Sequence, residues 1–221
     1  MGTSVNQVAH LSAAQAHSNF EFLPLLERAW ALDPYRGGPF SYASLSDEVE
    51  CCPRAGHFGL ALSARGELCR STFHYLSRDQ DEQRGVLITR WYPHGIERAE
   101  VRDGIWILCT HLSVNIDERA RQILELASIV EGLQGPLLLL GDLNEVPTSE
   151  VLLPLNQVGL CDLFEMVHPA IMASERWTFS VKQPNRCIDY MYGRGIECRR
   201  IEVARSLKGS DHFPVWAEII W

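Results

Sequence analysis

The stretch that decides the fold is GPLLLLGDLNEVP, residues 135–147. Its four consecutive leucines, residues 137–140, predict a short strand buried on both faces, because a strand with one solvated face alternates apolar and polar residues. An acid and an amide, Asp142 and Asn144, follow at once. If the backbone stays extended beyond Gly141, both side chains point to the same side at the carboxyl end of a core strand, a common position for chemistry in α/β proteins. The alternative is a strand followed by an Asx turn.

Length and composition favour one domain over residues 1–221, because a chain with 46% hydrophobic and 22% charged residues can form one well-buried core. The sequence has no apolar run of about 18 residues or more, and its start lacks the basic and then apolar layout of a secretory signal. We therefore expect a cytoplasmic protein without stable insertion into a membrane.

Charge and cysteine content narrow the function classes further. The net charge of −8 lacks the electrostatic footprint of a non-specific nucleic-acid binder. The seven cysteines form an odd set without a Cys-x-x-Cys pair, which argues against a disulfide framework and against a structural zinc site. Reduced and mostly buried thiols are expected.

Other apolar patterns predict strands and helices on both sides of the leucine run. Apolar residues recur at spacings of three and four over residues 117–134, which predicts an amphipathic helix that Gly135 ends. A second helix is predicted over residues 20–32, and a short helical stretch over 149–156. Strands are expected at residues 58–63, 86–92, 105–110, 177–181, 187–192, 201–204 and 215–220. The alternation of strand, helix and strand indicates a layered α/β domain.

Polar clusters occur at the ends of four of these strands. They are Thr110-His111-Leu112, Gly141-Asp142-Leu143-Asn144, Ile188-Asp189-Tyr190 and Ser210-Asp211-His212. Each has an ordinary structural explanation when taken alone: a histidine at the boundary of the core, a strand followed by a turn, an acid on an edge strand, and a turn.

In this order and spacing, the four clusters resemble those of the endonuclease/exonuclease/phosphatase superfamily, from about Phe58 to the end of the chain. Supporting matches lie at residues 58–63, 84–85, 111–113, 118–119, 122, 177–179, 211–212 and 214–215. The resemblance implies an α/β (α+β) four-layer sandwich, in which two mixed β-sheets pack face to face with helices outside. It also implies hydrolysis of a phosphate ester with the aid of magnesium.

The resemblance further implies roles for the acids and the amide. Asp142 would orient or deprotonate the attacking water, and Asn144 would hold the phosphate. Asp211 would face a metal ion, which Asp142 would also help to bind. Carboxylates around a phosphate repel it, so a cation is a physical requirement, and hard oxygen ligands favour Mg²⁺ or Mn²⁺.

The two histidines have implied roles of their own. His212 would act on the phosphoryl oxygens or as a general base, with Asp189 fixing its tautomer. His111 would help to neutralise charge that develops in the transition state. Such a site works mainly by positioning and by electrostatic stabilisation.

The chain departs from the family pattern in residues 1–57. Members of the family begin with a core strand that ends in Asn, followed by a second strand that ends in Gln-Glu, whose Glu is the principal metal ligand. Neither is found here, and residues 5–11 look instead like the helix that follows this Glu. Four glutamates could lie near the site, but none follows a strand pattern: Glu21, Glu27, Glu48 and Glu50. The sequence therefore suggests an N-terminally incomplete domain, and a catalytically impaired member that acts as a non-enzymatic domain is the alternative.

The substrate stays open at this stage. A lipid headgroup, an inositol phosphate or a nucleotide suits the acidic net charge better than long duplex DNA does. Two residues are candidates for substrate contact: Arg186, which precedes the strand of Asp189, and Trp177, the first residue of the Trp-Thr-Phe match.

Overall fold

The central element is a six-stranded sheet with the order β4-β5-β6-β7-β9-β8. The computed structural model describes residues 19–29, 33–36, 55–79, 81–94, 104–207 and 209–221. The strands of this sheet are β4 (Gly66–Tyr75), β5 (Gly85–Pro93), β6 (Ile105–His111), β7 (Leu137–Asp142), β8 (Cys161–Asp162) and β9 (Asp189–Arg194). Strands β6 and β7 are parallel and all other neighbours are antiparallel, so the sheet is mixed.

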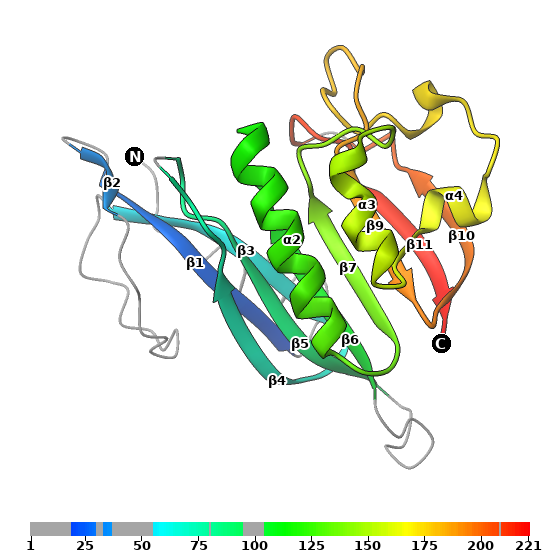
Figure 1. Cartoon of the computed structure of the whole chain (residues 1–221), viewed down its shortest axis with the longest axis horizontal. Helices are drawn as coiled ribbons and strands as arrows, with labels where there is room; N and C mark the ends of the chain where they lie inside the picture. Colours follow the sequence, from blue (N-terminus) through cyan, green and yellow to red (C-terminus); the bar gives the residue numbers. More distant parts are fainter. Residues whose placement is uncertain (1–18, 30–32, 37–54, 80, 95–103, 208) are drawn as a thin grey trace.

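Helix α2 (Ile116–Gly132) connects the two parallel strands and covers one face of the sheet (Figure 1). Asn115 caps the helix, because its side-chain oxygen accepts hydrogen bonds from the amides of Asp117 and Glu118. The 3₁₀ turn η2 (Glu150–Leu152) and the short helix α3 (Leu153–Gln157) extend this layer. No helix among the described residues has the length and apolar character needed to cross a membrane.

The opposite face of the sheet is covered by further strands. The hairpin of β10 (Glu197–Val203) and β11 (Val215–Ile220) packs there together with helix α4 (Leu163–Val167). A three-stranded antiparallel sheet, β2 (Asp33–Arg36), β1 (Asn19–Ala29) and β3 (Ala55–Ala64), brings Leu60 and Leu62 to the same side. The predicted sandwich fold is confirmed, but its second β-layer consists of two antiparallel pieces in the described part of the chain.

The leucine run is buried on both faces, as the sequence predicts. Leu137 and Leu139 pack in the core under α2, whereas Leu138 and Leu140 pack in the core shared with β10 and β11. Such a strand has no solvated face, which explains the absence of alternation.

The predicted helix at residues 20–32 is wrong, because residues 19–29 form strand β1. This strand pairs with β3 from Asn19 opposite Ala64 to Ala29 opposite Ala55. Pro24 lacks an amide hydrogen and disfavours a helix interior, and in β1 it lies where the register shifts. The described residues between 1 and 57 thus form β1, β2 and the start of β3, although no clear strand pattern is visible in their sequence. The predictions for residues 5–11 lie outside the described residues.

A predicted strand and the end of a predicted helix also differ from the sequence prediction. Residues 177–181 do not form a regular strand and make only isolated bridges, from Phe179 to Arg186 and to His212. Helix α2 ends at Gly132, and Gly135 instead lies in the turn into β7 with a φ of +92°. The strands predicted at 58–63, 86–92, 105–110 and 215–220 are present as β3, β5, β6 and β11.

Candidate active site

Three of the predicted site residues lie on one line across the sheet. His111 at the end of β6 is the register partner of Asp142 at the end of β7. Asp142 is in turn the partner of Asp189 at the start of β9. Because direct register partners lie on the same face of a sheet, the three side chains converge at one edge of it. The Nε2 atom of His111 lies 3.5 Å from Oδ2 of Asp142.

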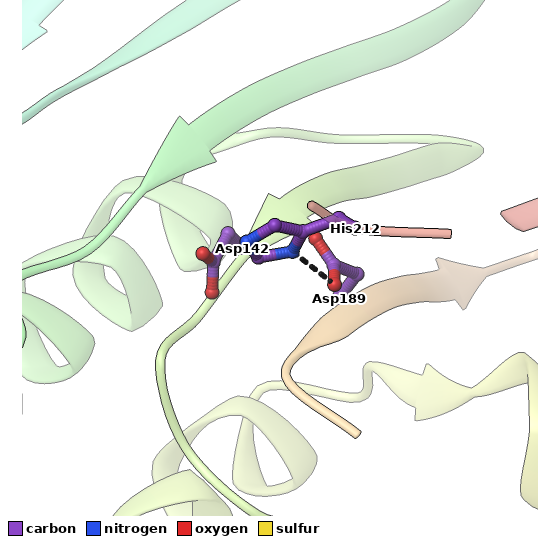
Figure 2. Close-up of side chains that lie close together, drawn as sticks. All are labelled: Asp142, Asp189 and His212. Atoms are coloured by element: carbon purple, nitrogen blue, oxygen red, sulfur yellow. Dashed lines mark hydrogen bonds and ion pairs between the residues drawn. The ribbon is translucent and has the colours of Figure 1, made fainter. Parts of the chain in front are cut away.

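His212 joins this line from the segment before β11. Its Nδ1 lies 2.8 Å from Oδ2 of Asp189. A carboxylate only accepts hydrogen bonds, so Nδ1 donates and Nε2 of the neutral ring is left as an acceptor. Potential ligand atoms of Asp142, Asp189 and His212 all lie within 4.8 Å of one another. Figure 2 shows the imidazole of His212 between the two carboxyl groups.

Thr178 holds the Asp189 and His212 segments together. Its fully buried hydroxyl oxygen accepts hydrogen bonds from the amides of Ile188 and Asp189, at 3.2 and 3.3 Å. Its backbone oxygen accepts from the amide of Phe213 at 2.8 Å. In the sequence Thr178 is visible only as part of a motif, and this supporting role cannot be recognised there because its partners are distant along the chain.

The turn after β7 is an Asx turn, and it lies at the site as well. Oδ1 of Asp142 accepts a hydrogen bond from the amide of Asn144 at 2.8 Å, and Asn144 has a φ of +51°. The extended backbone therefore ends at Asp142, so the expectation that it continues to Asn144 and points both side chains to one side is not met. The Asn144 amide group instead donates to the backbone oxygen of Leu112 at 2.9 Å, which joins this turn to the end of β6.

Burial gives the site unusual protonation behaviour. It raises the pKa of Asp142 to about 6, with a further upward effect from Asp189 and opposing effects from the Asn144 amide, His212 and Arg84. Burial lowers the pKa of His111 to about 4, and the positive charge of Arg84 lowers it further. At pH 7 the site therefore holds a largely ionised Asp142 beside a neutral His111. Arg84 is a second contributor, and the sequence showed only a motif match at residues 84–85 and not this electrostatic role.

The remaining candidates lie around this group or outside it. Asp211 is exposed and accepts a hydrogen bond from the Ser210 hydroxyl at 3.3 Å, and it is not part of the close group of potential ligand atoms. Arg186 is exposed, and its guanidinium lies 4.9 Å from the ring of Phe179, which contacts His212. Trp177 is half-buried. Of the four glutamates considered as ligands, two lie on β1, and Glu48 and Glu50 lie outside the described residues.

Comparison with known proteins decides the family. A model of the Endonuclease/Exonuclease/phosphatase family matches residues 5–212. The chain belongs to this family. Members of the endonuclease/exonuclease/phosphatase family are hydrolases that act on phosphoester bonds and generally depend on divalent metal ions. No curated protein matches the sequence.

Solved structures share the endonuclease/exonuclease/phosphatase fold at low sequence identity. A functionally unknown conserved protein from Enterococcus faecalis has a TM-score of 0.66 and 21% identity, with 97% of this chain and 81% of that chain covered. The human Nocturnin catalytic domain with bound sulfate has a TM-score of 0.64 and 17% sequence identity, with 97% of this chain and 76% of that chain covered. A mannosyl-6-phosphatase from Bacteroides thetaiotaomicron has a TM-score of 0.62 and 15% sequence identity, with 97% of this chain and 82% of that chain covered.

Proposed function

We propose that this chain hydrolyses a phosphate ester in a reaction that depends on Mg²⁺ or Mn²⁺. The observation that supports this most is the convergence of Asp142, Asp189 and His212, whose potential ligand atoms lie within 4.8 Å of one another. The family membership and the phosphatase among the structural neighbours support the same reaction class.

The Asp189–His212 pair supplies an oriented imidazole. The carboxylate holds the hydrogen on Nδ1, so Nε2 of His212 is free to accept a proton or to approach a phosphoryl oxygen once it is protonated. The ring of Phe179, 4.8 Å from the imidazole, restricts its movement. This arrangement suits a group that transfers a proton during ester hydrolysis.

Asp142, His111 and Asn144 complete the proposed site. With a pKa of about 6, Asp142 is mostly ionised at neutral pH but is basic enough to orient a water molecule and to take its proton. His111 is neutral, so it can donate one hydrogen bond without adding charge. One hydrogen of the Asn144 amide is used by Leu112, and the second is available for a phosphate oxygen.

The acidic residues fit a divalent cation. The carboxylates of Asp142 and Asp189 lie close together in the group of potential ligand atoms. Their repulsion is a second cause, smaller than burial, of the raised pKa of Asp142. A cation would offset this repulsion, and carboxylate oxygens are ligands that Mg²⁺ and Mn²⁺ prefer. We propose that Asp142 holds the cation with Asp189, and Asp211 remains the second ligand predicted from the sequence. The bound cation would neutralise negative charge on the phosphoryl group.

We infer that the substrate is a small phosphate ester or a lipid or inositol headgroup rather than long duplex DNA. The net charge of −8 disfavours a polyanionic duplex, since six to ten phosphate contacts normally require a basic surface. Arg186 is exposed beside Phe179 and is the proposed contact for a charged group of the substrate.

The test is hydrolysis of bis(4-nitrophenyl) phosphate with and without millimolar Mg²⁺ or Mn²⁺. We expect metal-dependent turnover that Asp142→Asn lowers by at least about 100-fold, because the variant cannot take a proton. Asp79→Asn is the matched control, since Asp79 is exposed and pairs with Arg121 on α2. Turnover no greater than that of Asp142→Asn, together with no Mn²⁺ binding by calorimetry, would instead support the non-enzymatic alternative.

A further inference from the structure

The side chain of Arg119 on α2 joins two segments that follow site strands. Its Nε and Nη2 donate to Oε2 of Glu145 at 3.0 and 2.8 Å. Its Nη1 donates to the backbone oxygens of Ser113 and Val114 at 2.9 and 3.0 Å. All three nitrogens of this guanidinium are therefore engaged, and they connect the segment after β6 to the segment after β7.

These segments directly follow His111 and Asp142, the last residues of β6 and β7, and the second one includes Asn144. Ser113 lies two residues after His111, and Glu145 lies three residues after Asp142. The backbone oxygen of Glu145 also accepts a hydrogen bond from the hydroxyl of Tyr190 at 2.7 Å, directly beside Asp189 on β9. Glu145 thus lies just after β7, bonds to Tyr190 on β9, and is joined through Arg119 to the segment after β6.

Neither charged group is available to a substrate. Arg119 is 6% exposed and Glu145 is 7% exposed. Apolar residues of similar volume often stabilise a fold as well as such a buried ion pair does, so stability alone is a weak explanation for the pair. What an apolar pair would lack is the set of directional hydrogen bonds to the two segments.

We propose that Arg119 and Glu145 are positioning residues that fix Asp142 and Asn144 relative to His111 and to the Asp189–His212 pair. The inference rests on the proposed function and names a determinant of its rate. A small displacement of a reacting group, of the order of 1 Å, can lower a rate about 100-fold. The pair therefore acts on the chemical step, and kcat depends on it more than KM does.

The first experiment replaces the ion pair by apolar residues, Arg119→Met with Glu145→Leu, so that no charge is left buried. We expect a folded protein by circular dichroism, a KM within about twofold of the wild-type value and a kcat lowered about 10- to 100-fold. The exposed pair Arg121→Met with Asp79→Asn, in which Arg121 is also on α2, is the control and should keep the wild-type kcat. An unchanged kcat in the folded double variant overturns the proposal.

A second pair of variants keeps the test decisive if the double variant does not fold. Glu145→Gln preserves shape and one acceptor oxygen, and Arg119→Lys preserves charge but cannot reach Glu145, Ser113 and Val114 together. Both should lower kcat while KM is retained, with Glu145→Gln the milder of the two. Wild-type kcat in both variants contradicts the proposal.

A readout that needs no turnover separates this inference from the proposed function. The imidazole NMR signals of His111 and His212 should shift in the Arg119 and Glu145 variants and stay unchanged in the Arg121 control. If the wild-type protein has no hydrolytic activity but the Arg119 and Glu145 variants shift these signals, the proposed function is refuted and the positioning inference stands. Unshifted signals overturn the inference whatever the activity.

Discussion

Gly141 offers a sharp test of how the sheet places Asp142. It has a φ of +144°, which residues with a side chain rarely adopt. A Cβ atom at this position would lie 1.9 Å from the backbone oxygen of Thr110 on the neighbouring strand β6. Carbon and oxygen in contact need more than 3 Å, as the 3.0–3.4 Å range of the closest real Cβ contacts indicates. Gly141→Ala therefore forces β6 and β7 apart by about 1 Å, a large disturbance for a packed interior.

The expected cost follows from two contributions. A side chain in a sparsely populated backbone region costs about 1–3 kcal/mol. Overpacking against the Thr110 backbone adds about 1–3 kcal/mol. The free energy of unfolding should fall by about 2–6 kcal/mol in urea titrations at 25 °C, and kcat should fall by at least about 10-fold, because Asp142 is the next residue.

Gly132→Ala is the matched control. Gly132 is the last residue of α2, and a Cβ atom there would meet nothing within 4 Å. Alanine is the better helix former, so this variant should be neutral or more stable by up to about 1 kcal/mol, with wild-type activity. A Gly141→Ala protein within 1 kcal/mol of the wild type would refute the strand geometry described for this edge.

Three further predictions concern electrostatics and support around the site. Arg84→Met should raise the pKa of His111, because the Arg84 charge disfavours protonation, and an unchanged NMR titration would contradict this. The pKa of Asp142 is raised to about 6, so below that pH a proton competes with a cation for its carboxylate. The Mn²⁺ affinity measured by calorimetry should therefore rise from pH 5 to pH 7 and then level off. A pH-independent affinity would show that Asp142 is no ligand. Thr178→Val leaves the amides of Ile188 and Asp189 without their acceptor and should lower the free energy of unfolding by about 1–3 kcal/mol, whereas no loss in urea titration would deny Thr178 its supporting role.

Local apolar patterns predicted the elements that determine the core. The leucine run and the spacing of apolar residues over 117–134 reflect burial along single segments, so β7 and α2 could be recognised without knowledge of their partners. Residues 19–29 show the limit of this approach. Their apolar residues fit helical spacing, yet they form a strand because they pair with β3, from Ala29 opposite Ala55 to Asn19 opposite Ala64.

The site could be predicted in part for the same reason. Polar residues directly after buried strands are visible in a sequence, and the structure brings His111, Asp142, Asp189 and His212 together. The residues that support them are not visible in this way. The partnership of Arg119 with Glu145 spans 26 positions and depends on the crossing of α2 over the sheet, which no local pattern records.

The central claim is that the imidazole of His212, oriented by Asp189, takes part in hydrolysis of a phosphate ester. The most direct measurement is kcat for bis(4-nitrophenyl) phosphate with Mg²⁺ in the wild type, in His212→Ala and in Asp189→Asn. The account predicts that both variants fold and lose at least about 100-fold in kcat. Equal kcat values in the three proteins would contradict it.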